Sequence, residues 1–274
     1  MAIAAEYAIC VIYVFVFVVG LVVGSFLNVC IYRLPRGLSI VSPRSRCPGC
    51  LSPIKAWQNI PVLSYLLLGG KCRNCGSSIS IRYPMVELLN AFLYLGLYYK
   101  FGPEWYPALY MFIASVLVVI TFIDLEFQLI PNVITLPVML TGIVLSTFVL
   151  PDPYGFGEPL GLKGSLIGLF TGGGIFYAIQ VLSLLILKKE GMGGGDTKMM
   201  AMLGAYIGWK SILITIFVGS LAGSIVGVAL IVIKGRGRDS RIPFGPFLAF
   251  GALTAIFFGR KIVGLYLGTP EMLQ

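Results

Sequence analysis

Two aspartates are the first candidates for chemistry in this chain. Asp124 ends the long apolar stretch TFID, and Asp196 follows three glycines in GMGGGDTK. Acidic residues at the edge of the hydrocarbon layer are rare and usually functional. The chain has no histidine, which excludes Ser-His-Asp triads, Cys-His dyads and HExxH zinc proteases. A pair of carboxylates is therefore the leading candidate for acid–base chemistry.

Two carboxylates that share one proton can hydrolyse an amide bond. The ionised aspartate takes a proton from water, while the protonated one polarises the scissile carbonyl and then supplies a proton to the leaving amine. Each aspartate also has a structural interpretation, because Asp196 could be a helix N-cap and Asp124 could pair with basic neighbours at the membrane surface. A transporter or channel in which both aspartates line a proton or cation path is a further alternative.

The elements that must position these aspartates are predicted to be membrane helices. Hydrophobic residues make up 58% of the 274 and charged residues 11%, against about 45–50% and about 25% in soluble proteins. The uncharged runs fall at 7–32, 88–99, 105–123, 127–151, 164–187, 199–209, 211–233 and 242–259. We expect an all-α polytopic membrane protein with about eight transmembrane helices, of which the sixth is the weakest.

The distribution of basic residues predicts the orientation of these helices. If all eight runs cross the membrane and the N-terminus is outside, 15 of the 20 Lys and Arg residues lie inside, in agreement with the positive-inside rule. They are Arg33, Arg36, Arg44, Arg46, Lys55, Lys71, Arg73, Arg82, Lys188, Lys189, Lys198, Lys234, Arg236, Arg238 and Arg241. In this topology Asp124 ends the third span and Asp196 begins the sixth, so both lie near the cytoplasmic face.

Residues 33–83 form the only sizeable segment that is predicted to lie outside the membrane. This segment holds two CxxC pairs, which are Cys47 with Cys50 and Cys72 with Cys75. The spacing predicts a four-thiolate zinc site, whose role would be structural because four protein ligands leave no open position. Two disulfides or four unrelated free thiols are the alternatives, of which a reducing cytosol disfavours the disulfides. Cys10 and Cys30 lie in the first apolar run and are predicted to be packing residues.

The same segment carries eight Lys and Arg residues and no Asp or Glu. A membrane-anchored zinc ribbon that binds nucleic acid would have this charge. The positive-inside rule together with contact to anionic membrane lipid explains the charge equally well and is the simpler interpretation. We therefore expect membrane lipid, and no nucleic acid, among the partners.

Several segments of the chain resemble the type IV prepilin peptidase family, the leader-cleaving enzymes of type IV pilus and type II secretion systems. The segments are GSFLNVCIYRLP, CPGC with CRNC, IRYPMVELLN, DLEFQLIPN and GMGGGDTKMM. The resemblance runs from Gly24 to about Trp209, and the order of the motifs makes it specific. Asn132 stands where many members of the family carry Asp, and no other departure affects the motifs.

The resemblance implies a role for particular residues. Asp124 and Asp196 match the catalytic pair of these GxGD-type membrane aspartic proteases. Gly193 and Gly195 match the glycines of GxGD, and Lys198 matches the lysine that follows the motif. The CxxC pairs match the cytosolic segment that bacterial members carry.

The resemblance also implies a substrate and a second reaction. The substrate would be a prepilin or pseudopilin, cut after a glycine that separates its basic leader from a hydrophobic helix at the cytoplasmic boundary of the bacterial inner membrane. Many bacterial members then N-methylate the new N-terminus with S-adenosylmethionine; a peptidase without this activity is the alternative. Glu87 is a secondary candidate for the methyl-donor site, and it could equally pair with Arg82.

These expectations divide the chain into three parts. They are a first transmembrane helix at 1–32, a cytosolic zinc-binding segment with four cysteines at 33–83, and a transmembrane aspartic peptidase core at 84–274.

Overall fold

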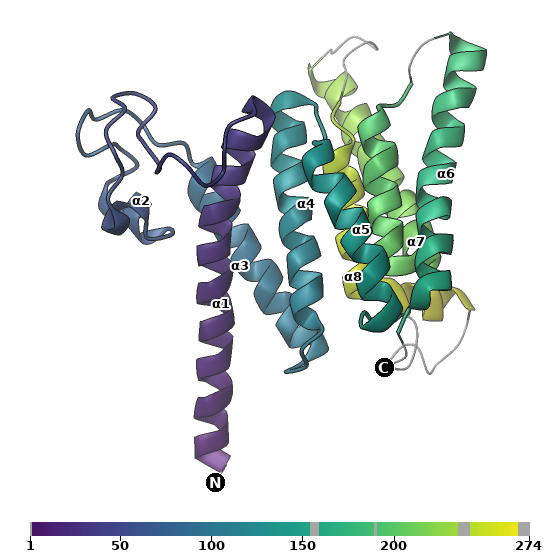
Figure 1. Cartoon of the computed structure of the whole chain (residues 1–274), viewed down its shortest axis with the longest axis horizontal. Coiled ribbons are helices and arrows are strands. Elements are labelled where there is room, and N and C mark those ends of the chain that lie inside the picture. Colours follow the sequence, from purple (N-terminus) through teal and green to yellow (C-terminus); the bar gives the residue numbers. More distant parts are fainter. Residues whose placement is uncertain (1, 154–158, 189–190, 235–241, 268–274) are drawn as a thin grey trace. The chain divides into compact units, whose positions relative to one another are not determined.

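The structure is a computed structural model that describes residues 2–153, 159–188, 191–234 and 242–267 (Figure 1). It divides into two compact units, Met1–Val119 and Ile120–Gln274. Apart from three isolated bridge pairs, the regular structure of the described residues is helical, which confirms the predicted all-α fold. The basic residues Lys189, Arg236, Arg238 and Arg241, which contribute to the predicted orientation, lie outside the described residues.

The first unit contains two long helices and a segment with little regular structure between them. Its elements are α1 (Ala2–Arg33), the 3-10 turns η1 (Leu34–Arg36) and η2 (Ala56–Asn59), α2 (Leu63–Leu67), α3 (Arg82–Phe101) and the beginning of α4 (Pro107–Phe127). The segment between α1 and α3 corresponds to the predicted cytosolic segment.

Helices α1 and α3 pack closely because α1 presents glycines to its neighbour. A Cβ atom at Gly20 would lie 2.6 Å from the Cα of Ala91, and one at Gly24 would lie 2.7 Å from the Cα of Glu87. Small residues four apart let helix backbones approach closely, as is typical of helix pairs in membranes. The close approach also places Glu87 of α3 against Gly24 of α1.

A buried polar network joins α1, α3 and α4 within this unit. The amide of Asn90 donates to the Gly20 carbonyl at 2.8 Å and its oxygen accepts from the Ser115 hydroxyl at 2.9 Å. The hydroxyls of Ser115 and Tyr94 are 3.0 Å apart. Because each of these buried groups has a partner, the network avoids the cost of unpaired polar atoms.

The second unit is a helical bundle that begins within α4 and continues through α5 (Asn132–Phe148), α6 (Gly161–Leu187), α7 (Gly194–Lys234) and α8 (Gly245–Leu267). Helix α7 packs against α5, α6 and α8 (Figure 1). A Cβ atom at Gly168 of α6 would overlap the Gly204 carbonyl of α7, and one at Gly204 would overlap the Gly168 carbonyl. The backbones of α6 and α7 are therefore in direct contact.

Helix α7 is broken at Gly208, whose φ of 71° and ψ of 169° are not helical. A break of this kind releases carbonyls in the preceding turn from their usual partners. Here the Ala205 carbonyl accepts two hydroxyls from other helices, Ser146 of α5 at 2.7 Å and Ser165 of α6 at 2.9 Å. The break lies close to the predicted boundary between the runs 199–209 and 211–233.

Each of the eight apolar runs contains a helix, or part of one, in the structure. Among the described residues, five helices are long and apolar enough to cross a membrane, namely α1, α4, α6, α7 and α8, and α5 is a shorter apolar helix. The chain is therefore a multi-pass membrane protein, while the count of eight spans stays a prediction because α7 holds two runs in one broken helix.

Candidate active site and metal centre

Asp124 lies in the last turn of α4 and is buried, with 6% of its surface exposed. Its Oδ2 atom accepts a hydrogen bond of 2.9 Å from the backbone N–H of Gly245. Gly245 is the first residue of α8, so the carboxylate meets the end of that helix where unpaired N–H groups carry partial positive charge. The alternative of surface pairing with basic neighbours does not fit a side chain that is buried against α8.

Gly245 is a part of this site that the sequence analysis did not include. A Cβ atom at this position would lie 2.7 Å from Oδ2 of Asp124, so only glycine allows the backbone to approach the carboxylate. The available signal was the Gly245-Pro246 pair at the start of the last apolar run, since proline is favoured at the first positions of a helix.

Asp196 lies in the first turn of α7, two residues after the helix begins at Gly194. Its backbone N–H donates to the Gly193 carbonyl at 3.2 Å, and its carboxylate accepts a hydrogen bond from the Gly193 N–H. The N-cap position, immediately before the helix, is occupied by Gly193. The interpretation of Asp196 as the N-cap residue was therefore wrong. A carboxylate in the first turn interacts favourably with the helix dipole.

The structure brings the two aspartates together. Their carboxylates are close enough for their negative charges to interact, although 71 residues separate them in the sequence. A close contact supports this arrangement, because a Cβ atom at Gly195 would lie 3.0 Å from Cβ of Ile130. The glycine loop before α7 therefore packs against the connection that follows α4. The catalytic role of the pair stays a prediction.

Lys198 does not bind either aspartate. Its Nζ atom donates a hydrogen bond of 2.9 Å to Oδ1 of Asn132, the first residue of α5. The lysine therefore links the beginning of α7 to the beginning of α5, beside the aspartates. An Asp at position 132, as in many members of the family that the sequence resembles, would form an ion pair with the same lysine.

Each aspartate is held by a peptide N–H at or beside the beginning of a helix, α8 for Asp124 and α7 for Asp196. Peptide donors stabilise the ionised form of a carboxylate, while two neighbouring carboxylates resist double ionisation. The pair therefore favours a state with one shared proton, in which one group can act as a base and the other as an acid.

The cysteines lie in two turns of the same design in the first unit. In one turn Leu51 N–H donates to the Cys47 carbonyl at 2.9 Å, and in the other Gly76 N–H donates to the Cys72 carbonyl at 2.9 Å. Leu51 and Gly76 both have positive φ, 58° and 70°. The repeated turn points the two thiols of each CxxC pair in one direction.

The four cysteine Sγ atoms fit a single metal ion. They all lie within 4.8 Å of one another, and those of Cys47 and Cys75 are 3.8 Å apart. A tetrahedral zinc site with Zn–S bonds of about 2.3 Å places its sulfurs about 3.8 Å apart. All six cysteines of the chain are free thiols in the structure, so neither of the two disulfides of the alternative is formed.

Hydrogen bonds favour the thiolate form of two of the four cysteines, Cys47 and Cys75, whereas the pKa of Cys72 is raised, mainly through its side-chain contact with Cys47. The backbone N–H of Cys50 and the hydroxyl of Ser77 lower the pKa of Cys47 to about 6. The Ser77 hydroxyl is also the main cause of the lowered pKa of Cys75. Because the thiolate is the form that binds metal, these donors prepare the cluster for a cation.

The remaining cysteines behave differently from one another. Cys30 is buried with 8% of its surface exposed, as expected of a packing residue. Cys10 is exposed on the surface of α1, so the prediction that it packs inside the protein was wrong for this residue.

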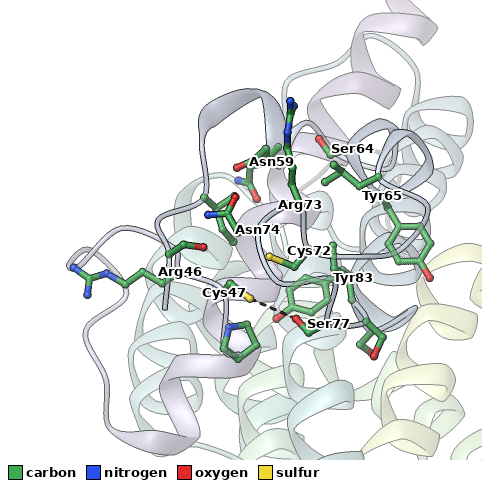
Figure 2. A pocket seen from close by; sticks show the side chains of 18 of the residues that line it. Arg46, Cys47, Asn59, Ser64, Tyr65, Cys72, Arg73, Asn74, Ser77 and Tyr83 are labelled. Atoms are coloured by element: carbon green, nitrogen blue, oxygen red, sulfur yellow. Dashed lines mark hydrogen bonds between the residues drawn. The ribbon is translucent and has the colours of Figure 1, made fainter. Parts of the chain in front are cut away.

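A cavity of about 270 Å³ lies beside the cysteine cluster within the first unit. Figure 2 shows Cys47, Cys72 and Ser77 around it, with Arg73 and Asn74 at another edge. Glu87 also lines the cavity and is 6% exposed. Its Oε2 atom accepts a hydrogen bond of 2.7 Å from the N–H of Val62. The groups that act on this carboxylate in the described residues are Val62 and Ser25 and not Arg82, in contrast to the predicted alternative.

Comparison with protein-family models identifies two matches along the chain. Residues 18–101 match the bacterial peptidase A24 N-terminal domain, and residues 111–228 match the type IV leader peptidase family. The first match covers the cysteine cluster and Glu87, and the second covers both aspartates and Lys198. The comparison with solved structures found no match.

Several curated proteins named prepilin leader peptidase/N-methyltransferase are similar over nearly the whole chain. The protein of Aeromonas salmonicida is 37% identical, with 93% of each chain covered. That of Pseudomonas aeruginosa is 36% identical over 90% of this chain and 91% of its own. That of Neisseria gonorrhoeae is 36% identical over 84% and 85%.

Proposed function

The chain belongs to the type IV leader peptidase family, and from this premise we propose that it is a membrane aspartic endopeptidase that cleaves prepilins or pseudopilins and then N-methylates the product. Cleavage removes the basic leader after a glycine at the cytoplasmic boundary of the inner membrane. The observation that carries the proposal is the meeting of Asp124, in the last turn of α4 and bonded to the first residue of α8, with Asp196, in the first turn of α7.

The aspartates divide the work of hydrolysis between them. A water molecule between the carboxylates loses a proton to the ionised aspartate and attacks the carbonyl carbon of the scissile bond. The protonated aspartate donates a hydrogen bond to the carbonyl oxygen, and the carboxyl groups then return a proton to the leaving amine. Gly193 and Gly245 hold the carboxylates in place through their N–H groups, which keeps the pair aligned for this exchange.

The supporting residues of the glycine loop have separate tasks. Gly195 allows the loop to pack against Ile130, and Lys198 ties the start of α7 to Asn132. Both interactions keep Asp196 at a fixed distance from Asp124. We assign both residues a positioning role, because Gly195 has no side chain and the amine of Lys198 bonds to Asn132.

The metal bound by Cys47, Cys50, Cys72 and Cys75 is proposed to be zinc, in a structural role. Four thiolates suit zinc and leave no position for a substrate. The metal would fold the segment between α1 and α3, which has little helix to stabilise it.

The methyl donor is proposed to be S-adenosylmethionine, which supplies an activated methyl group when bound. The names of the similar proteins include an N-methyltransferase activity. Only a cleaved pilin has the free amine that accepts the methyl group, so cleavage precedes methylation. We propose that the N-terminus of this chain lies outside and that both active sites face the cytoplasm, where the donor is found.

We also propose the three-part organisation predicted from the sequence. The segment 33–83 is the proposed metal-binding part, and 84–274 contains both aspartates. Residues 1–32 would form the first transmembrane helix, which packs on α3.

The experiment that tests the proposal follows a prepilin through both reactions. The purified full-length protein is incubated with a prepilin and S-adenosylmethionine, and the product is measured by intact mass. We expect loss of the leader followed by gain of one methyl group at the new N-terminus. A prepilin that stays uncut with well-folded enzyme would overturn the peptidase assignment, and a cut product that never gains a methyl group would overturn the transferase assignment.

A further inference from the structure

The proposed methyl transfer requires a site for a ligand of unusual charge. S-adenosylmethionine carries a positive sulfonium and ammonium together with a negative carboxylate. A site that recognises it needs a negative group for the cations, a positive group for the carboxylate, and a cavity that shields the reacting methyl group from water.

The cavity beside the cysteine cluster meets the requirement for a mixed surface. Its volume of about 270 Å³ is slightly below the usual range of small-molecule sites, about 300 to 1,000 Å³. Its lining includes apolar residues such as Ile54, Ile60 and Ile79. It also includes polar residues such as Asn59, Asn74 and Tyr83 (Figure 2). All of these residues lie in the first unit.

Glu87 is the only acid among the residues that line this cavity. It is 6% exposed, and its partners in the described residues are the Val62 N–H and the Ser25 hydroxyl. Both are neutral, so no Lys or Arg of the described residues neutralises the carboxylate. A buried carboxylate without a cation is costly, which favours a positively charged ligand in the cavity.

A positive group lies at another edge of the cavity. The guanidinium of Arg73 stacks over the ring of Trp57 at 4.9 Å, a contact that holds it in one place. Arg73 lines the cavity together with Asn74 (Figure 2). Arg is the side chain that best matches a carboxylate, through two parallel hydrogen bonds.

From this arrangement we infer that the cavity is the binding site for S-adenosylmethionine, with the sulfonium against Glu87 and the donor's carboxylate at Arg73. The inference rests on the proposed methyl transfer and assigns it a site. It gives Glu87 a binding role in addition to the hydrogen bond that it accepts from Val62.

The transfer itself balances without another reactant. The lone pair of the neutral pilin amine forms the new N–C bond to the methyl carbon. The C–S bond breaks and its electron pair remains on sulfur, which leaves neutral S-adenosylhomocysteine. The methylated amine then carries the positive charge and releases a proton to water.

The metal contributes to this site indirectly. Cys47 and Cys72 line the cavity, and the four thiols lie within 4.8 Å of one another. A metal that joins them fixes one wall of the cavity, so occupancy of the metal site and binding of the methyl donor are coupled.

The test compares two ligands that differ in one charge. S-adenosylmethionine has the sulfonium, and S-adenosylhomocysteine has a neutral thioether with the same ammonium and carboxylate. Equilibrium dialysis of each radiolabelled ligand is done with full-length protein and with its variants, without prepilin. Glu104→Gln serves as the matched control, because Glu104 is an exposed acid on the loop before α4.

We expect Glu87→Gln to weaken binding of S-adenosylmethionine by about 10- to 100-fold, because this is the usual contribution of a hydrogen bond or contact to a charged group. Binding of S-adenosylhomocysteine, which lacks the sulfonium charge, should change by less than about threefold. Arg73→Gln should weaken both ligands equally, because both carry the carboxylate. If Glu87→Gln retains the metal and loses the same binding affinity for both ligands, Glu87 has only a structural role, and the assignment is overturned.

A second measurement uses the unaltered protein and does not depend on how well a variant folds. Ultraviolet crosslinking of radiolabelled S-adenosylmethionine, followed by peptide mapping, should label peptides within residues 46–87. Label in the second unit by a protein that methylates pilin would overturn the site and leave the proposed function intact. A protein that cleaves prepilin but neither methylates it nor binds the donor would overturn the proposed methyl transfer.

Discussion

The aspartate pair and the cysteine cluster are held in place by different means. The aspartates lie at the ends of helices in a bundle whose backbones touch at Gly168 and Gly204, and peptide N–H groups fix their carboxylates. The cysteines lie on two short turns in a segment with little helix. The first site is positioned by packing, whereas the second depends on a metal to join its turns. The two sites should therefore fail under different treatments.

The largest expected effect is on the aspartates. Asp124→Asn and Asp196→Asn should each lower the rate of leader removal by about 10²- to 10⁴-fold, the usual contribution of general acid–base catalysis. The double variant should lose little more, because the two groups act as one unit. The rates are measured with a purified prepilin. Asp152→Asn is the control, and a single aspartate variant that cleaves like this control would contradict the paired mechanism.

The next effect tests whether packing sets the aspartate geometry. Gly245→Ala would place a Cβ atom 2.7 Å from Oδ2 of Asp124 and displace the carboxylate or α8. Because a displacement of about 1 Å can cost about 100-fold in rate, we expect a loss of that order in cleavage. Gly174→Ala is the matched control, since a Cβ atom there would meet no neighbouring atom within 4 Å. Equal rates for the two variants would show that α8 does not position Asp124.

Removal of the metal should affect the other region. Full-length protein treated with a chelator, or carrying Cys47→Ser, should lose its zinc, and a protease should then cut the segment between α1 and α3. Binding of S-adenosylmethionine should fall in the same preparations. Cys10→Ser is the control, because Cys10 is exposed on α1 and lies outside the cluster. A segment that stays protease-resistant and binds the donor without metal would remove the contrast between the two regions.

The smallest effect concerns the link between α5 and α7. Asn132→Asp converts the hydrogen bond of 2.9 Å from Lys198 into an ion pair at an exposed site. Exposed ion pairs contribute about 0.2–1 kcal/mol, so prepilin cleavage should change by less than about fivefold. Lys198→Met, which removes the link, should lower the rate by more than Asn132→Asp. The opposite order would indicate that the lysine does not position the start of α7.

The parts of the molecule that the sequence predicts are those with local signals. The apolar runs predict the helices because spans of about 20 uncharged residues have few alternatives, and the CxxC spacing predicts the thiol cluster. The sequence separates the runs 199–209 and 211–233 but does not predict that one helix, broken at Gly208, holds both of them. The break depends on the packing of α5 and α6 around Ala205, which has no local signal.

The contacts between distant segments could not be predicted in the same way. The hydrogen bond from Gly245 to Asp124 joins residues 121 apart, and no local pattern encodes it. The same holds for Val62 and Glu87: the sequence identified Glu87 as an unusual acid but suggested Arg82 as its partner. Exposure of Cys10 was also missed, because a helix that is apolar on all sides does not reveal which face is buried.

One measurement tests most directly whether cleavage and methyl transfer occur at separate sites. A pilin that has already lost its leader is incubated with Asp196→Asn enzyme and S-adenosylmethionine, and the pilin is examined by intact mass. Two separate sites predict that the pilin gains one methyl group at a rate similar to that of the unaltered enzyme, although the variant cannot cut a prepilin. A well-folded, zinc-loaded variant that fails to methylate the pre-cleaved pilin would contradict this and place both reactions at the aspartates.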